Sequence, residues 1–490
     1  MAYSRTNNKR PKSRFPAATT ARSVVHQRLR EEAHRYPDLG LEPLDTSALK
    51  GPGAGREAAL AHAIYDAVMR RWITLEAMLA PHLTGPNSRP VHELDSTVRA
   101  ALLAGAAQLL LLERVPPHAA INEAVNWTRS AGKPKATGLV NAVLRRVSES
   151  VARAEEGWPV VIEEPVEAHV GKADRLPLSD GRALQLTRDV FPTETLPWLE
   201  AATGNPRSLV EQWHSRLGEA GAIEQALHTL VSPPVVINHA HADAVVEAPE
   251  GQTLTPHETN DGLSVLGPVG SSPREILKGR KDIWVQDATS AGALDLLENI
   301  DPKPKLIVDL CAGLGTKTRQ LRAMFPEATI YACDTNEARA KGLRRVFAKD
   351  ELTEVMDIDD VRYEAAGKAD LVLLDVPCSN SGVLPRRPEA RYRLTTDIGR
   401  EQLDRLTTVQ HDLLAQSQAM LAPGGRVLYA TCSMDEEENQ AITKWAVESV
   451  GFTLERERFV LPKGLPGQPP TAYADGGYAA LLAIKAGEGR

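Results

Sequence analysis

Hydrophobic positions recur at helical spacing along the first third of the chain. The segment REAALAHAIYDAVMRRWITLEAML places apolar residues three or four positions apart and contains no internal proline or glycine. Similar stretches follow, one stopped by Pro116 and Pro117 and another ending at Gly132. The helical stretches occupy residues 56–79, 94–115, 118–132 and 136–151. Because no strand-like run interrupts them, the pattern predicts an all-α bundle over residues 22–150.

From residue 283 to the end, short apolar runs alternate with helical stretches. Each run is short and mainly apolar, as in strands that are buried on both faces of a parallel sheet. The runs are Lys305–Leu310, Thr329–Asp334, Asp370–Asp375 and Arg426–Ser433. This alternation predicts a doubly wound, Rossmann-like α/β domain over residues 283–490. In such folds a ligand binds beyond the carboxyl ends of the strands.

The remaining segments are less regular. Residues 1–21 are polar, basic and poor in aliphatic side chains, which predicts a disordered tail. Residues 151–282 are rich in proline, glycine and acids, with helical pieces such as 208–231 and a short strand-like run, PPVVIN, at 233–238. We expect a connecting region with a small α/β module there. The fold class is therefore multidomain: a helical bundle, a connecting module and an α/β domain.

Composition narrows the class of protein. A chain of 490 residues is too long for one core, and 42% hydrophobic with 25% charged residues is typical of a globular protein. The longest apolar stretch, 100–112, is too short to cross a bilayer, and residues 1–20 lack the apolar core of a signal peptide. The four cysteines form no CxxC pair and no zinc-type spacing. We therefore expect a cytoplasmic protein with reduced thiols, no membrane partner and no metal site.

The charge is distributed unevenly. The formal net charge is −7, yet residues 1–150 contain 21 Lys and Arg against 13 Asp and Glu, and the remainder contains 36 against 51. This asymmetry suggests that the N-terminal part meets a polyanion such as nucleic acid. A solvated basic surface on an acidic enzyme would give the same numbers, so charge alone leaves both interpretations open.

A glycine-rich turn follows the first predicted strand of the α/β domain. In DLCAGLGTKT (309–318), Gly313 and Gly315 allow a tight turn, and the helix that follows offers unpaired N–H groups. The second strand ends at Asp334, where an acid can accept hydrogen bonds from the ribose hydroxyls of a nucleotide-like cofactor. The turn is neither a Walker sequence nor a GxGxxG motif. By itself it is also compatible with a purely structural turn.

Two cysteines stand at the ends of two other predicted strands. Cys378 follows Asp375 in LLDVPCSNS, and Cys432 follows the run VLYAT. A single strand-end cysteine is usually a small buried side chain, but two in polar turns favour chemistry. A thiolate that attacks carbon-6 of a pyrimidine makes carbon-5 nucleophilic toward a sulfonium methyl donor, with an acid to polarise the ring. The residues do not show which cysteine attacks.

Several segments resemble a known family. DVPCSNSGVLPRRPEARYR (375–393) and YATCSMDEEEN (429–439) resemble the two cysteine motifs of RNA (cytosine-carbon-5) methyltransferases. DLCAGLGTKT, WVQDATSAGAL and PPVVIN resemble the cofactor loop, its lead-in and a linker segment of the same family, while LLLLERVPPHAAINEAV and ATGLVNAVLRR resemble a NusB-type RNA-binding domain. This pairing of domains is characteristic of the bacterial 16S rRNA methyltransferase B group.

The resemblance implies S-adenosylmethionine as cofactor and gives the cysteines separate roles. Cys432 is then the nucleophile, and Cys378 assists release of the methylated product. The cofactor would be bound by Asp334, by Asp375 and by an acid after the third strand, for which we select Asp359 from Asp357, Asp359 and Asp360. The remaining implied cofactor contacts are Cys311, Ala312, Gly313, Leu314, Gly315, Thr316 and Lys317.

Two departures from the family pattern accompany this resemblance. The loop lacks the family's proline and one of its glycines, although Gly313 restores conformational freedom one position earlier. In the linker segment, Val236-Ile237-Asn238 stands where the family has an arginine before valine and asparagine.

The expected partner is RNA, with 16S rRNA favoured over tRNA, and the expected state is a monomer. The basic segment after Cys378 could hold phosphates and stack a base. Its candidate residues are Arg386, Arg387, Arg391, Tyr392 and Arg393. Two alternatives stay open at this stage: the same chemistry on tRNA, and a NusB-like RNA-binding scaffold without catalysis. The sequence does not identify the target cytosine, nor whether naked rRNA or an assembling subunit is the substrate.

Overall fold

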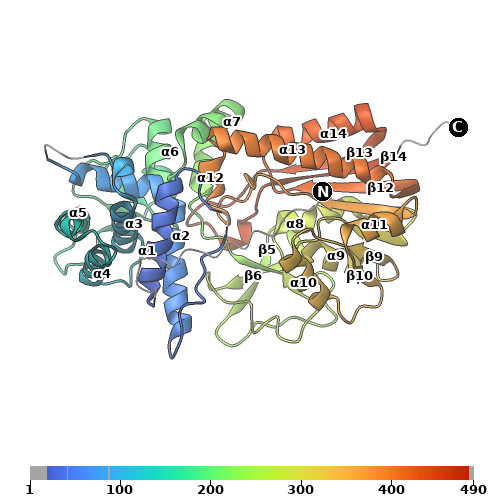
Figure 1. Ribbon diagram of the computed structural model, residues 1–490, viewed down its shortest axis with the longest axis horizontal. Helices are drawn as coiled ribbons and strands as arrows, with labels where there is room; N and C mark the ends of the chain where they lie inside the picture. The colour runs from blue at the N-terminus through green and yellow to red at the C-terminus, as the bar shows by residue number, and fades with distance from the viewer. Residues whose placement is uncertain (1–18, 41, 86–88, 485–490) are drawn as a thin grey trace. The chain divides into compact units, whose positions relative to one another are not determined.

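Helices fill the N-terminal part of the computed structural model, which describes residues 19–40, 42–85 and 89–484 (Figure 1). The described residues divide into two compact units: those within 19–163, 169–178 and 183–207 form the first, and those within 164–168, 179–182 and 208–484 form the second. Most of the predicted disordered tail falls outside the described residues. Helix α1 begins at Ala21, where Thr20 caps it.

The first unit is the predicted all-α bundle with a small sheet added. Helix α3 is buried almost all round and packs against α1, α2, α4 and α5, which explains its uniformly apolar sequence. A three-stranded antiparallel sheet, in the order β1-β3-β2, and helix α6 follow the bundle. The elements are α1 (Ala21–Arg35), α2 (Ala54–Leu79), α3 (Ser96–Leu111), α4 (Pro117–Ser130), α5 (Thr137–Glu149), β1 (Val161–Ile162), β2 (Arg175–Pro177), β3 (Ala183–Gln185) and α6 (Thr195–Thr203).

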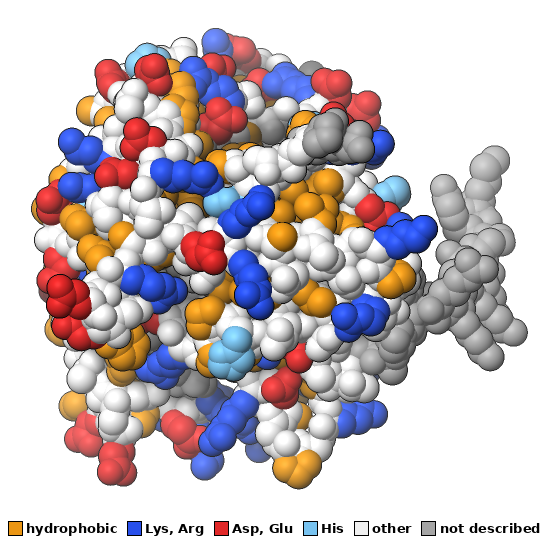
Figure 2. Space-filling model, turned by 90° about the vertical axis from the view of Figure 1, so that its left-hand side faces the viewer, with side chains coloured by type: hydrophobic (Ala, Val, Ile, Leu, Met, Phe, Trp, Pro, Cys, Tyr) orange, Lys and Arg blue, Asp and Glu red, His pale blue; other side chains and the backbone are white. Residues whose placement is uncertain are grey.

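Basic side chains on this unit do not form one continuous patch on the face that Figure 2 shows. Lys and Arg side chains are spread across that face among acidic and hydrophobic ones. None of the helices among the described residues is long and apolar enough to cross a membrane.

The predicted connecting region, residues 151–282, is divided between the two compact units. Its first part, up to residue 207, belongs mainly to the first unit, and its second part belongs to the second unit. That second part contains α7 (Arg207–His228), which is interrupted at Gly218, and a four-stranded sheet in the order β5-β6-β4-β7. The PPVVIN run forms β4, as predicted. The strands are β4 (Val235–Asn238), β5 (Thr253–His257), β6 (Asn260–Gly267) and β7 (Trp284–Val285).

A seven-stranded sheet in the order β10-β9-β8-β11-β12-β14-β13 carries the rest of the second unit. The four predicted runs form β8, β9, β11 and β12, which are parallel, whereas β14 runs antiparallel to β12. The strand–helix alternation does not indicate this reversed strand. The strands are β8 (Leu306–Asp309), β9 (Thr329–Ala332), β10 (Thr353–Val355), β11 (Ala369–Asp375), β12 (Leu421–Thr431), β13 (Phe452–Val460) and β14 (Gly477–Ile484).

Helices cover both faces of this sheet, so its central strands are apolar on both sides. Val372 and Leu374 of β11 pack on the face covered by α11, α13 and α14, while Leu371 and Leu373 face η5 (Leu294–Leu297) and α9. The fold class is therefore confirmed as a doubly wound α/β unit. The helices are α8 (Ala288–Gly292), α9 (Thr316–Met324), α10 (Glu337–Val346), α11 (Ile358–Ala365), α12 (Ala390–Arg393), α13 (Asp397–Gln418) and α14 (Gln440–Trp445).

A buried acid ends the central strand β8. The Asp309 side chain is almost inaccessible to solvent and accepts a hydrogen bond from the Thr318 hydroxyl at 2.7 Å. Burial raises the pKa of Asp309 to about 7; the Thr318 hydrogen bond opposes this shift, and the charge of Asp375 adds to it.

This raised pKa predicts a pH-dependent stability. Between pH 4 and pH 7 the unfolded chain has released the Asp309 proton while the folded chain still holds it, so the free energy of unfolding should fall as pH rises. Asp309→Asn cannot titrate. The free energy of unfolding of wild type minus that of Asp309→Asn should therefore decline across this window by up to about 1.4 kcal/mol per pH unit. Urea unfolding at several pH values measures it.

The control is the same change at an exposed position. Asp404 lies on the solvent side of α13, so Asp404→Asn should leave the pH dependence as in wild type. Parallel pH curves for wild type and Asp309→Asn would mean that Asp309 is ionised in the folded protein throughout this range.

Candidate active site

The glycine-rich turn lies at the carboxyl end of β8, between that strand and α9. Gly313 and Gly315 both have positive φ, 57° and 83°, a region that side chains rarely adopt. At Gly315 a Cβ atom would also lie 2.7 Å from Leu343 Cδ1 and 3.0 Å from Phe347 Cε2. The turn therefore depends on glycine at these positions, and its backbone is left open to a ligand's approach.

Asp334 joins this turn to the end of β9. Its carboxylate accepts hydrogen bonds from the Gly313 N–H at 3.0 Å and from the Asn336 N–H at 2.7 Å. Asp334 and the glycine-rich turn, both predicted from the sequence as parts of one site, are thus in direct contact. An acid and a glycine turn at adjacent parallel strand ends fit the ribose and the polar tail of a nucleoside cofactor.

A partly buried ion pair lies between the turn and the cysteines. Lys317 Nζ is 2.8 Å from Asp375 Oδ2, at the end of β11. Burial lowers the pKa of Lys317, but Asp375 more than compensates, so the pKa of the lysine is raised and it stays charged. The site therefore presents one fixed cation and one carboxylate beside the thiols.

The two strand-end cysteines meet. Cys378 Sγ and Cys432 Sγ are 3.1 Å apart, and Cys432 Sγ also lies 3.3 Å from Asn380 Oδ1. The pKa of Cys378 is raised well above its ordinary value, first by its hydrogen bond to Cys432 and then by burial. Cys378 therefore stays protonated and can donate its S–H proton to the neighbouring sulfur.

Hydrogen bonds tie the two cysteine loops together. The Asp435 carboxylate accepts from the hydroxyls of Ser381 at 2.8 Å, Ser379 at 3.1 Å and Ser433 at 3.3 Å. The Glu438 carboxylate accepts from the Ser379 N–H at 2.9 Å and from Gln410 Nε2 at 3.0 Å. Part of the acidic run after Cys432 therefore accepts hydrogen bonds from the Cys378 loop inside the protein.

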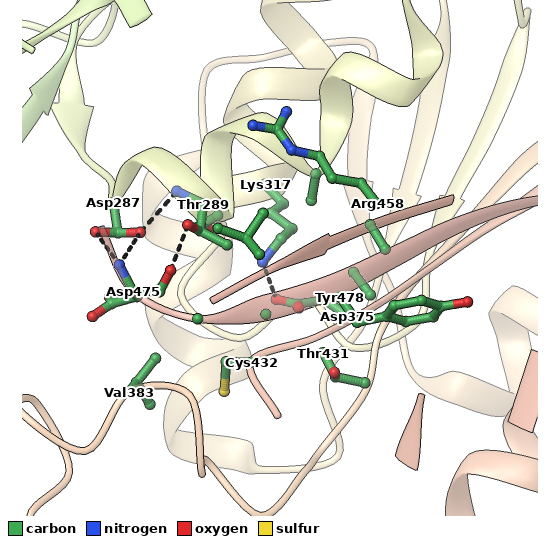
Figure 3. Close-up of a pocket in the computed structure, with 17 residues that line it drawn as sticks. Asp287, Thr289, Lys317, Asp375, Val383, Thr431, Cys432, Arg458, Asp475 and Tyr478 are labelled. Atoms are coloured by element: carbon green, nitrogen blue, oxygen red, sulfur yellow. Dashed lines mark hydrogen bonds and ion pairs between the residues drawn. The ribbon is translucent and has the colours of Figure 1, made fainter. Parts of the chain in front are cut away.

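A pocket opens beside this arrangement (Figure 3). Lys317, Asp375 and Cys432 line it, together with the start of α8 and the segment before β14. Figure 3 shows Lys317 reaching Asp375 inside the pocket, with Asp287 and Asp475 grouped at its edge. The cation, the acid and the thiol of Cys432 can therefore all face one bound molecule.

The structure does not bring Asp359 to this site. Its side chain is 91% exposed on α11 and pairs with Arg362 at 3.2 Å in the same helix. Asp357 instead follows β10 directly at the start of α11, and its charge contributes to the raised pKa of Cys333, next to Asp334. The Asp357 side chain is 80% exposed and pairs with Arg344 of α10 at 3.2 Å.

The expectation for the basic segment after Cys378 is largely wrong. Arg391 and Tyr392 are fully buried, so Tyr392 has no face on which an RNA base could stack. Arg393 donates to Gln402, and Arg386 is engaged with two buried acids. Arg387 is about half exposed, near Glu389. A short basic run, here partly in the loop and partly in α12, does not reveal which of its side chains the fold turns inward.

Sequence reasoning missed residues that the site contains. Asp287 and Asp475 lie far apart in sequence and meet only in the fold. Glu438 belongs to a run of acids that resembles a solvated surface, and Asn380 has a positive φ of 63°, which no motif announced. Asp309 stood inside the quoted turn and could have been found from its place at the strand end.

Comparison with known proteins gives one consistent result. The NusB family matches residues 19–149, and the family described as 16S rRNA methyltransferase RsmB/F matches residues 297–456. Ribosomal RNA small subunit methyltransferase B of Xanthomonas campestris is 30% identical over 407 residues, covering 81% of this chain and 80% of the relative. The Vibrio cholerae protein of that name is 28% identical, covering 80% and 82%.

A solved structure supports the fold. The crystal structure of PH0851 covers 94% of this chain and 98% of its own, with a TM-score of 0.60 and 22% identity. Together with the glycine turn, the strand-end acids and the relatives, these findings show that the chain belongs to the ribosomal RNA small subunit methyltransferase B family, whose methyl donor is S-adenosylmethionine and whose substrate is RNA.

Proposed function

We propose that this protein methylates carbon-5 of a cytosine in 16S rRNA through a covalent cysteine–cytosine adduct. The observation that carries the proposal is the 3.1 Å contact between Cys378 and Cys432, beside the Lys317–Asp375 pair. Two thiols at one point of a site suit a cycle with one attack and one elimination. A scaffold that only binds RNA has no use for them.

Cys432 is the proposed nucleophile. Its thiolate attacks carbon-6 of a cytosine turned into the pocket, and the ring electrons then make carbon-5 nucleophilic. The bound cofactor supplies an electrophilic methyl group at carbon-5. A base then takes the carbon-5 proton, the carbon-6–sulfur bond breaks, and the double bond re-forms as the Cys432 thiolate leaves, so the ring ends aromatic and methylated.

Cys378 is the proposed partner for release. Its raised pKa keeps it a thiol, which stabilises a thiolate on the adjacent Cys432 by hydrogen bonding before attack and again at elimination. Asn380, beside the Cys432 sulfur, helps to hold that side chain. The order of the two cysteines follows the family resemblance, and the protonated state of Cys378 agrees with it.

Asp375 and Lys317 are the proposed contacts to the cytosine ring, in addition to the contacts with the cofactor that the resemblance implies for both. The Asp375 carboxylate can accept a hydrogen bond from the amino group of the ring, and from N3 once that nitrogen carries a proton, while the lysine charge compensates the negative charge that attack creates in the ring. Both groups lie in a protected site, where such electrostatic help is stronger than in water.

The proposed cofactor cradle is the turn from Cys311 to Lys317, with Asp334 on the ribose hydroxyls. For the acid after the third strand we now propose Asp357, from its place at the end of β10, in preference to Asp359. The first unit is the proposed docking part for RNA, in line with its NusB-type fold and the basic balance of residues 1–150. A cytoplasmic monomer remains the expected state.

The first prediction concerns the cofactor. Asp334→Ala should weaken binding of S-adenosylmethionine by about 1–3 kcal/mol, because a protected hydrogen-bond acceptor is lost. Asp357→Ala should weaken it to a smaller extent, and Asp359→Ala, on the exposed side of α11, should leave it unchanged. Isothermal titration calorimetry measures all three. A loss of affinity in Asp359→Ala alone would mean that Asp359, and not Asp357, is the acid that contacts the cofactor.

The second prediction separates the two thiols. Cys432→Ala cannot form the adduct, so it should be inactive and release RNA freely. Cys378→Ala can attack and methylate but should stall before elimination, leaving enzyme covalently bound to RNA. A denaturing gel after incubation with 16S rRNA and S-adenosylmethionine should show a shifted band for Cys378→Ala alone.

Other outcomes have clear meanings. A shifted band in Cys432→Ala alone would exchange the two roles. Full methylation by both variants would mean that the two cysteines have only a packing role, and it would contradict the covalent mechanism. Bisulfite mapping of the product tests carbon-5 directly, and transfer RNA offered in parallel tests the alternative substrate.

A further inference from the structure

A charged cluster at the edge of the pocket takes no part in the chemistry above. Arg386 Nε lies 2.6 Å from Asp475 Oδ2, and Arg386 Nη2 lies 3.4 Å from Asp287 Oδ2. Both acidic side chains are 7% exposed, and the arginine is 31% exposed. The three residues come from distant segments: the start of α8, the loop that carries Cys378, and the segment that precedes β14.

The two acids are fixed on their own side of the cluster. Asp287 accepts from the Thr289 N–H at 2.8 Å and so caps α8, while the Thr289 hydroxyl donates to the Asp475 carbonyl at 2.6 Å (Figure 3). The Tyr473 hydroxyl donates to Asp475 Oδ1 at 2.5 Å. Burial, together with the charge of Asp475, raises the pKa of Asp287 to about 7, although Arg386 opposes this shift. Arg386 is thus the cation that stabilises two neighbouring buried acids.

Backbone hydrogen bonds connect this cluster to the thiols. The Gly476 N–H, next to Asp475, donates to the Gly382 carbonyl at 2.7 Å, and the Gly382 N–H donates to the Cys432 carbonyl at 2.9 Å. A Cβ atom at Gly382 would lie 2.6 Å from the Gly476 oxygen and 2.8 Å from the Cys432 oxygen. The Cys378 loop is therefore clamped between the Cys432 loop and the segment that contains Asp475.

We propose that Arg386 is a positioning residue that anchors the far end of the Cys378 loop to Asp287 and Asp475 and so keeps the Cys378 and Cys432 sulfurs in contact. Arg386 contacts neither thiol. Its effect runs through the loop, from the guanidinium to Gly382 and on to the backbone of Cys432. The significance for catalysis rests on the proposed function, but the claim about sulfur positions does not.

The rate of forced disulfide formation measures those positions without RNA or cofactor. Diamide oxidises two adjacent thiols: a sulfur–sulfur bond forms, and the two protons and two electrons pass to diamide, which becomes a hydrazine. Peptide mapping by mass spectrometry identifies the Cys378–Cys432 bond and distinguishes it from reactions of Cys311 and Cys333. In the full-length protein, Arg386→Gln should slow formation of this bond about tenfold or more, since small displacements of reacting groups have large effects on rate.

Arg387→Gln is the matched control. It removes one positive charge from the next position, where the side chain is about half exposed, so the crosslinking rate should match that of wild type. Thermal melting of each variant establishes that the protein is folded. A wild-type rate in folded Arg386→Gln, or an equal slowing in Arg387→Gln, overturns the proposal.

A second variant covers the case in which Arg386→Gln does not fold because it leaves two buried acids without a cation. The double variant Arg386→Gln with Asp475→Asn removes one of those charges and should fold, yet crosslink slowly because the anchor is still missing. A wild-type rate in the folded double variant overturns the proposal. So does failure of both variants to fold, because Arg386 would then support folding and not thiol position. Because the assay needs neither RNA nor cofactor, its outcome is independent of the methylation assays.

Discussion

The parallel pairing of β11 with β12 sets the distance between the two thiols. Asp375, the last residue of β11, lies opposite Ala430 of β12, so the chains leave the sheet side by side at the same edge. Cys378 and Cys432 follow within a few residues and meet at 3.1 Å. A shift of this register by one residue would turn every side chain of one strand to the opposite face and separate the two loops. The proposed chemistry therefore depends on a backbone register that the apolar core maintains.

Charge burial imposes a second constraint on the same edge. The acidic side chains gathered there need cations, because an unpaired buried charge is costly. Lys317 pairs with Asp375 inside the pocket, and Arg386 pairs with Asp475 and Asp287 at its rim. In the proposed mechanism the first pair contacts the substrate ring, whereas the second links segments that carry the thiols. The two ion pairs thus have different roles in the proposal, because one lies inside the pocket and the other joins the loops at its rim.

The acidic composition of the second unit has a partly internal explanation. Glu438 and Asp435 accept hydrogen bonds from the Cys378 loop, and Asp309 ends a central strand in a buried position. These acids stabilise loops that would otherwise leave backbone N–H groups and hydroxyls without partners. The negative balance of residues 151–490 is therefore not simply a surface property, and it does not argue against an RNA substrate.

Local sequence patterns were enough to predict the helical bundle, the α/β unit and the places of Cys378, Cys432, Lys317 and Asp334, because periodicity and strand-end motifs depend on local spacing. They did not determine which arginines of the basic segment face the core, since a charged run carries no periodic signal in a loop. They also left Asp357, Asp359 and Asp360 as alternatives, because a run of acids after a short strand does not show where that strand ends; in the structure β10 ends at Val355. The reversed strand β14 and the contact of Asp287 with Asp475, 188 residues apart, arose only in the tertiary structure. Contacts of that kind follow from how sheets and loops pack, and no local pattern records them.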